Sequence, residues 1–139
     1  MIGLLLVTHG EIGTALVESA TQILGAAPAQ VAKLSVWRQD DPDDLVLRAR
    51  EMLGAVDAGD GVLVLTDIFG ATPGNVVSRL LQDGRVEGVS GVSLPMLLRV
   101  LAARNGGGSR LTLAAAVQRA LSGGAEGVVH MNTDRCCDA

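Results

Sequence analysis

The chain has 139 residues, the usual size of one domain, and its formal charge at pH 7 is −4. Hydrophobic residues make up 48%, and the 18 glycines raise the apolar share to about 61%, above the usual 45–50%. This composition excludes extensive disorder and indicates a large core, an oligomer interface, or both. The chain has no basic run and only two aromatic residues, Trp37 and Phe69, so nucleic acid is not an expected partner.

The N-terminal residues and the cysteines indicate in which cellular compartment the protein works. No uncharged apolar stretch approaches the roughly 18 residues of a membrane span. The apolar start, residues 2–7, has no basic flank and no cleavage site, so it is interpreted as a strand and not as a signal peptide. Cys136 and Cys137 are adjacent in the tail, which makes a disulfide framework unexpected. Together these features predict a cytoplasmic protein.

Buried strands and amphipathic helices are predicted to alternate along the chain. In chain order we expect a strand at 2–7, a helix at 11–24, a strand at 31–36, a helix from the aspartates at 40–44 to about 56, a strand at 61–66, a helix from Thr72-Pro73 to 81, a strand at 86–92, a helix at 95–104, a helix at 111–121 and a short strand at 127–131.

Turn-forming residues mark the ends of these elements. Gly25 is expected to stop the first helix, and the Asp-Pro cluster at 40–44 supplies an N-cap and a first-turn proline. Thr72 is expected to cap the helix that Pro73 begins. The pair Gly123-Gly124 is expected to end the last helix, and the run 106–109 to form a flexible loop.

This alternation predicts an α/β fold with a mainly parallel central sheet. We expect a single flavodoxin-like, three-layer domain with strand order 2-1-3-4 and a short C-terminal strand. The domain is expected to span residues 1–131. Residues 132–139 are expected to be a disordered tail.

Two loops follow strands of this sheet and carry residues that burial does not explain. Thr8-His9-Gly10 ends the first strand, and the run from Asp67 to Asn75 ends the third. In parallel sheets, ligands bind beyond the carboxyl ends of the strands at the switch point. If the first and third strands are neighbours, His9 and Asp67 can touch. A carboxylate would then fix the imidazole tautomer and leave the other ring nitrogen as a nucleophile.

The second loop also suits an anion. Gly70 allows close approach to the backbone, and free N–H groups where a helix begins favour phosphate. A structural interpretation stays open for both loops. His9 could cap the following helix or bond a carbonyl, and the second loop could be an ordinary turn before a helix. The sequence shows no metal-binding cluster and no nucleotide-binding loop.

Three segments carry a resemblance to a known family. The runs LLLVTHG, GVLVLTDIFGATPGN and GVSLPMLLRVLAAR resemble enzyme IIA of the mannose type, a subunit of the bacterial phosphoenolpyruvate-dependent sugar phosphotransferase system. The resemblance runs from about Ile2 to about Met131. It implies a flavodoxin-like homodimer without a cofactor. It also implies a phosphotransferase that works through a phosphohistidine, with contact to the membrane only indirectly, through a permease.

The resemblance also implies roles for individual residues. His9 would accept the phosphoryl group from the phosphocarrier HPr and pass it to an enzyme IIB, for sugar uptake or its regulation. Asp67 would be the hydrogen-bonding partner of His9, and the loops 67–75 and 91–97 would line the site. The residues assigned to phosphate binding or to the partner surface are Thr8, Gly10, Phe69, Gly70, Ala71, Thr72 and Asn75.

The chain departs from the family pattern in the second loop, and two alternatives stay open. Ala71 and Thr72 stand where family members often carry Gly-Ser, and Gly74 replaces a commonly larger residue. One alternative is a phosphocarrier subunit of a dihydroxyacetone kinase. Such proteins are similar in fold but typically lack a run like Asp67–Pro73. The other is a non-catalytic flavodoxin-like binding module, which the scarcity of aromatic residues disfavours.

Overall fold

The computed structural model describes residues 1–106 and 110–133, and its centre is a four-stranded parallel sheet. The strands are β1 (Gly3–His9), β2 (Val31–Val36), β3 (Val62–Thr66) and β4 (Val86–Val89). Their order is β2-β1-β3-β4, as predicted. Strand β1 is central, with Leu4 paired to Val31 on one side and to Leu63 on the other. The carboxyl ends of β1 and β3 therefore emerge side by side.

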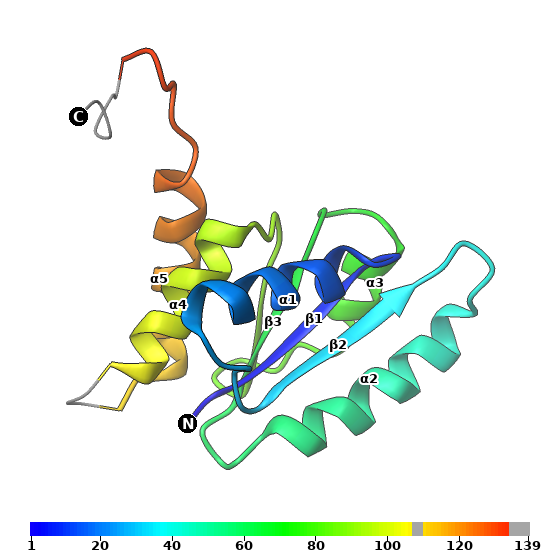
Figure 1. The fold of residues 1–139 in the computed structure, drawn as a ribbon. Helices are drawn as coiled ribbons and strands as arrows, with labels where there is room; N and C mark the ends of the chain where they lie inside the picture. Colours follow the sequence, from blue (N-terminus) through cyan, green and yellow to red (C-terminus); the bar gives the residue numbers. More distant parts are fainter. Residues whose placement is uncertain (107–109, 134–139) are drawn as a thin grey trace.

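Helices cover both faces of the sheet, which gives three layers (Figure 1). Helices α1 (Ile12–Leu24), α4 (Leu94–Asn105) and α5 (Leu113–Glu126) lie on one face. Helices α2 (Pro42–Val56) and α3 (Thr72–Ser78) lie on the other. None of the described helices is long and apolar enough to span a bilayer.

The sequence of β1 explains the two cores. Successive strand residues point to opposite faces, so Leu4 and Leu6 join the core under α1, α4 and α5. Leu5 and Val7 join the core under α2 and α3. Because both faces are buried, the strand needs a continuous apolar run and not an alternating pattern.

Two of the four predicted helix ends are confirmed by their caps. Gly25 ends α1 in the left-handed conformation with φ +86°, which glycine adopts without a steric penalty. Asp41 caps α2 by accepting the N–H of Asp43, with Pro42 as the first helical residue. The predicted cap at Thr72 is wrong. Helix α3 begins at Thr72, its N-cap residue is Ala71, and no side chain caps it.

The predicted end of the last helix at Gly123-Gly124 is also wrong, since α5 continues to Glu126. The reason is close packing against α4. A Cβ atom on Gly123 would lie 3.2 Å from the Cα of Met96, and one on Gly124 would lie 2.9 Å from the methyl carbon of Met96. These glycines allow two helices to approach closely and do not break the one that contains them.

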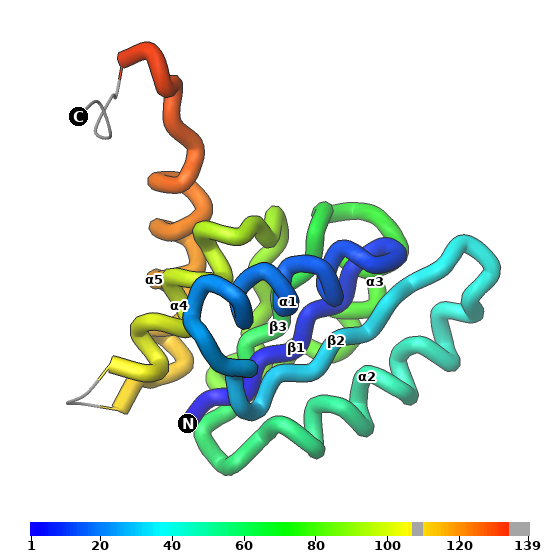
Figure 2. Tube along the Cα trace, in the orientation of Figure 1, coloured from blue at the N-terminus to red at the C-terminus, as the bar shows by residue number. Residues whose placement is uncertain are grey.

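The predicted C-terminal strand is wrong for this chain, because residues 127–131 form no strand. Val128 and Met131 are 84% and 78% exposed, and no strand among the described residues pairs with this segment. The segment instead extends away from the body as an arm (Figure 2). The fourth strand likewise ends at Val89 and not at residue 92. Two further predictions fall mostly outside the described residues. Of the predicted loop at 106–109, residues 107–109 are not described, and of the predicted tail at 132–139, residues 134–139 are not described.

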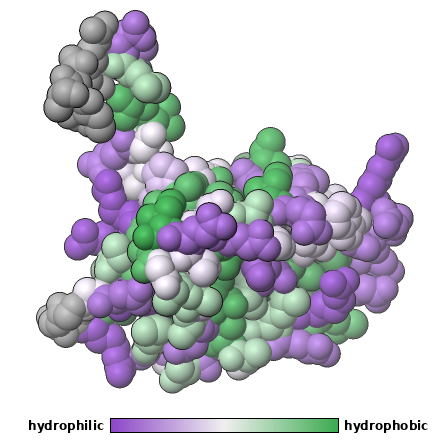
Figure 3. Space-filling model, in the orientation of Figure 1, coloured by the Kyte–Doolittle hydropathy of each residue, from purple (hydrophilic) through white to green (hydrophobic). Residues whose placement is uncertain are grey.

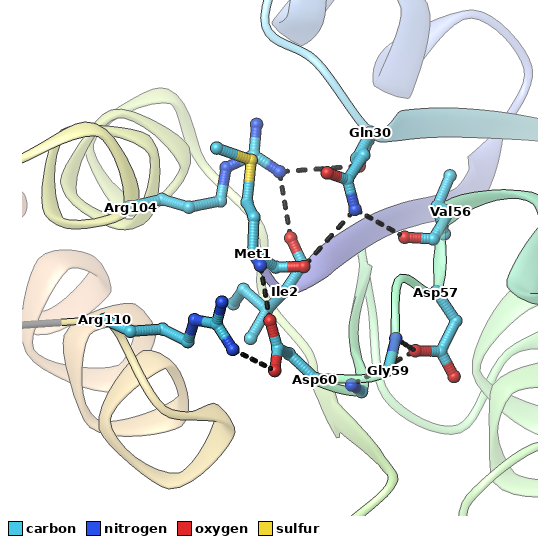
Figure 4. Close-up of polar contacts among 10 residues, drawn as sticks. Met1, Ile2, Gln30, Val56, Asp57, Gly59, Asp60, Arg104 and Arg110 are labelled. Carbon is cyan, nitrogen blue, oxygen red and sulfur yellow. Dashed lines mark hydrogen bonds and ion pairs between the residues drawn. The ribbon is translucent and has the colours of Figure 1, made fainter.

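Polar contacts close the opposite edge of the sheet, at the amino ends of the strands (Figure 4). The buried guanidinium of Arg104 donates to the carbonyls of Ile2, Ala29 and Gln30. Its Nε has no hydrogen-bond partner. Burial lowers the pKa of Arg104 from its usual value. Arg104 thus ties α4 to the starts of β1 and β2.

Candidate active site

His9 and Asp67 meet at the carboxyl edge of the sheet. Val7 of β1 pairs with Thr66 of β3, so the residues that follow leave neighbouring strands on the same edge. The Nδ1 atom of His9 lies 2.8 Å from Oδ2 of Asp67, and the backbone N–H of His9 donates to the same oxygen at 3.1 Å. The predicted contact between these two side chains is therefore present.

The surroundings of Asp67 favour its ionised form. Its carboxylate is largely covered, with 12% of the side chain exposed, and this burial raises its pKa. Hydrogen bonds from the side chain and backbone of His9 outweigh that effect and hold the pKa of Asp67 below its usual value of 3.8. The other oxygen, Oδ1, accepts the N–H of Ile68 at 3.1 Å. Asp67 is thus a fixed anion at neutral pH.

The contact with Asp67 assigns separate roles to the two nitrogens of His9. In the neutral imidazole one nitrogen carries the proton and the other a lone pair. A carboxylate facing Nδ1 favours the proton there, which leaves the lone pair on Nε2. The side chain of His9 is 48% exposed, so the ring can meet a partner molecule. This geometry provides an accessible nitrogen nucleophile next to a fixed negative charge.

Thr8 lies beneath the first loop and not on its surface. It is 1% exposed, and its hydroxyl oxygen accepts the N–H of Gly13 at 2.8 Å. Gly10 follows His9 with φ +49° and donates its N–H to the carbonyl of Val36. A Cβ on Gly10 would lie 3.3 Å from the ring of Trp37. Thr8 and Gly10 therefore fix the backbone on both sides of His9.

The second loop, from Asp67 to Asn75, is largely exposed. Phe69 is 81% exposed, and Thr72 and Asn75 are exposed as well. Gly70 has φ +89°, a conformation that suits glycine, and Ala71 stands in front of α3. Gly74 lets α3 approach the loop, since a Cβ there would lie 3.0 Å from the carbonyl oxygen of Ile68. Of the predicted site residues of this loop, Phe69, Gly70, Thr72 and Asn75 are thus exposed, Ala71 is half-buried and Asp67 is largely covered.

Apolar side chains near His9 were not among the predicted site residues. Trp37 and Ile68 are 45% and 54% exposed. Ile12, the first residue of α1, is 44% exposed. The available signal was position, because Trp37 directly follows β2, Ile68 lies two residues after the end of β3, and Ile12 begins α1.

The donor set at the site does not suit a metal ion. Within residues 1–106 and 110–133 the structure holds no group of three His, Cys, Asp or Glu side chains that could bind one. The arrangement instead offers a nucleophilic nitrogen, a neighbouring anion and an exposed glycine-containing loop.

Comparisons with known proteins show the family to which the chain belongs. Residues 3–120 match the model of the family described as the PTS system fructose IIA component. The chain is 32% identical over 105 residues to the PTS system fructose-specific EIIA component of Bacillus subtilis strain 168, a match that covers 75% of this chain and 71% of that protein. The fold and these matches define a component of a sugar phosphotransferase system. More narrowly, the chain belongs to the PTS fructose IIA component family, as its resemblance to mannose-type IIA predicted.

Two further matches give the extent of the similarity. The chain is 31% identical over 105 residues to the PTS system mannose-specific EIIAB component of Escherichia coli K12, and it spans only 32% of that protein. The crystal structure of phosphotransferase system component EIIA from Streptococcus agalactiae superimposes with a TM-score of 0.83 at 25% identity, covering 96% of this chain and 99% of that one. The family assignment favours the sugar phosphotransferase role over the kinase-subunit and binding-module alternatives.

Proposed function

We propose that this protein is a phosphoryl carrier of a sugar phosphotransferase system. His9 receives the phosphoryl group from the phosphocarrier HPr and passes it to an enzyme IIB. The observation that supports this most directly is the 2.8 Å contact between Nδ1 of His9 and Asp67, which leaves Nε2 free for reaction. Residues 1–131 form the working unit in this proposal, and its setting is the cytoplasm.

The proposed transfer needs positioning and charge compensation more than acid–base chemistry. The lone pair of Nε2 attacks phosphorus, the bond to the donor's leaving atom breaks, and its electron pair returns to the donor. Positive charge then develops on the imidazole of His9. The Asp67 carboxylate stabilises that charge while it accepts the Nδ1 proton in a hydrogen bond. Transfer to the acceptor reverses the same steps and regenerates neutral His9.

The loops around His9 would hold the phosphoryl oxygens and the partners. Backbone N–H groups of Gly70, Ala71 and Thr72 and the hydroxyl of Thr72 are the donors that we assign to those oxygens. Exposed apolar side chains surround His9, and a carrier that meets two partners in turn needs such an accessible surface. We assign Trp37, Ile68 and Phe69 to this docking surface, since all three are exposed at the edge that carries His9.

We further propose that the protein is a homodimer in which the C-terminal arm of one copy covers the other. The arm comprises residues 127–133. Val128, Val129 and Met131 are exposed on it, and Figure 3 shows hydrophobic atoms on this projecting part. The outer edge of β4 has no strand partner among the described residues. Beside that edge lies a mainly apolar cavity of about 370 Å³. Its lining includes Thr66, Phe69, Val77, Leu81, Val89 and Leu121.

Phosphorylation with purified components tests the carrier proposal. HPr, enzyme I and phosphoenolpyruvate together should add one acid-labile phosphoryl group to the chain, seen by intact mass under alkaline conditions. The chain has two histidines, so His130→Ala is the matched control for His9→Ala. Labelling should disappear in His9→Ala and persist in His130→Ala. Phosphorus NMR should place the group on Nε2, and labelling of the His9→Ala variant would overturn the proposal.

A further inference from the structure

A second cavity, which is more polar than the first, lies away from His9. It is enclosed by α2, the end of α3 and the start of β4. It encloses about 300 Å³, enough for a small metabolite. Its floor is apolar and includes Leu53, Val62 and Leu80. The lining includes Val62 and Val86, the first residues of β3 and β4, so the cavity opens at the edge of the sheet opposite His9. The proposed phosphotransfer reaction uses none of these residues.

The charged lining of this cavity is predominantly positive. Three arginines, Arg50, Arg79 and Arg85, line it together with one acidic residue, Asp57. They come from three separate stretches of chain, namely α2, the C-cap of α3 and the turn before β4. This concentration of cations stands out in a chain whose formal charge is −4.

Ion pairs hold two of the three arginines in place. Arg79 donates to Asp43 at 2.8 Å, and Arg85 donates to Asp57 at 2.9 Å. Within the part of the chain that the structure describes, no ion pair is recorded for Arg50. Each guanidinium carries five N–H donors, so the two paired arginines keep donors to spare. The cavity thus has preoriented donors and one cation that a ligand can neutralise.

A glycine keeps this cavity open. Gly54 lies in the interior of α2, where glycine destabilises a helix by roughly 1 kcal/mol relative to alanine. It lines the cavity, and a Cβ added there would meet no atom within 4 Å. Packing therefore does not require a glycine at this position. A side chain there would instead occupy space at the cavity.

We propose that this cavity is a binding site for a small phosphate-bearing metabolite, separate from the His9 site. Guanidinium groups match the geometry of phosphate oxygens. Arg50 supplies the charge that no carboxylate among the described residues offsets, and Arg79 and Arg85 supply further N–H donors. The side-chain amide of Gln82, which also lines the cavity, adds a donor and an acceptor for hydroxyl groups of the ligand. The apolar floor accommodates its carbon skeleton.

Binding to the full-length, unphosphorylated protein tests the site without HPr or enzyme I. Inorganic phosphate, a hexose 6-phosphate and the free hexose are titrated, with amide NMR shifts and calorimetry as readouts. We expect saturable binding of the hexose phosphate, weaker binding of phosphate and none of the hexose. The shifted amides should include those of Gly54 and Gln82. Because His9→Ala should bind equally well, a failure of the carrier proposal leaves this test intact.

Three variants distinguish a specific binding site from nonspecific electrostatic attraction of the ligand to the protein. Arg50→Gln should weaken binding of the hexose phosphate about tenfold, as expected for the loss of one charged hydrogen-bond donor. Gly54→Leu should abolish binding while raising the melting temperature, because leucine favours a helix. Arg119→Gln makes the same charge change at an exposed position outside the cavity and should bind normally. An equal loss in Arg119→Gln, full binding by Gly54→Leu, or no saturable binding by the wild type would each overturn the proposal.

Discussion

His9 and Asp67, separated by 58 positions in the sequence, share two hydrogen bonds to one carboxylate oxygen. The backbone N–H of His9 and its ring Nδ1 both face Oδ2 of Asp67. The backbone bond fixes the loop, and the ring bond fixes the tautomer. A single side chain therefore sets both the position and the protonation of the proposed nucleophile.

Replacing Asp67 by Asn should slow phosphorylation of His9 far more than it affects the fold. The amide oxygen can still accept one hydrogen bond, but the negative charge that stabilises the developing imidazolium is lost. Removing one such stabiliser elsewhere reduces rates by about 10²–10³, or roughly 3–4 kcal/mol. The loss of stability should be about 1 kcal/mol. Rapid-quench phosphorylation and thermal melting of the same variant measure the two quantities.

The opposite pattern would assign Asp67 a purely structural role. A variant with a normal rate and a lowered melting temperature would show that the carboxylate only holds the loop. Asp43→Asn is a suitable control, because this carboxylate is exposed and forms its ion pair with Arg79 and not with His9. It should phosphorylate at the wild-type rate.

Acid should remove the stabilising effect of Asp67. The pKa of Asp67 in the folded protein is below its usual value of 3.8, so the carboxylate binds a proton less readily when folded. Its contribution is therefore fully present above the unfolded value and is lost as the pH falls through the folded one. The free energies of unfolding in urea of the wild type and of Asp67→Asn should differ at pH 5, and the difference should shrink as the pH falls below about 3.8. A difference that grows towards acid would contradict the direction of the shift.

The sequence predicted the parts of the fold that depend on local pattern. Continuous apolar runs identified the strands, and caps such as Asp41 and Gly25 located helix ends because their effect acts within one turn. The His9–Asp67 contact followed from the rule that parallel strands share a carboxyl edge. Gly123 and Gly124 led to a wrong prediction of the end of α5, because their role is to allow close packing against Met96 of α4. No local pattern contains that information.

The second cavity shows a different limit of sequence interpretation. Arg50, Arg79 and Arg85 lie 29 and 6 positions apart, and each alone is typical of a solvated surface. They share a cavity only because α2 and α3 pack on the same face of the sheet. Charge clusters assembled from separate elements therefore require the tertiary structure.

Replacing Arg104 by Met should destabilise the protein by about 2–4 kcal/mol, because three carbonyl groups lose a donor. Methionine keeps much of the apolar stem, so the lost packing is small. Urea unfolding at pH 7 measures the change, with Arg119→Met as the exposed control. A loss below about 0.5 kcal/mol would show that the cost of burying this cation, visible in its lowered pKa, cancels its hydrogen bonds.

The arm should hold the proposed dimer together. Val128 and Met131 are the most exposed hydrophobic residues on it, and a mainly apolar cavity lies beside the free edge of β4. If the arm of one copy fills the cavity of the other, the double variant Val128→Asp, Met131→Asp buries charge in an apolar site and should separate the copies. Light scattering at several concentrations should give a dimer for the wild type and a monomer for the variant.

A substitution in the cavity tests the same dimer without changing the arm. Leu121 lines the cavity and is 51% exposed, so Leu121→Asp changes the receiving surface without disturbing a buried side chain. Because the two surfaces meet only in the dimer, this variant should also be a monomer, with an unchanged melting temperature at low concentration. Thr133→Asp adds charge to the exposed end of the arm, beyond its apolar residues, and should remain dimeric. A wild type that stays monomeric at high micromolar concentration would refute the dimer outright. A dimer that survives both sets of substitutions would place the interface on another face of the molecule.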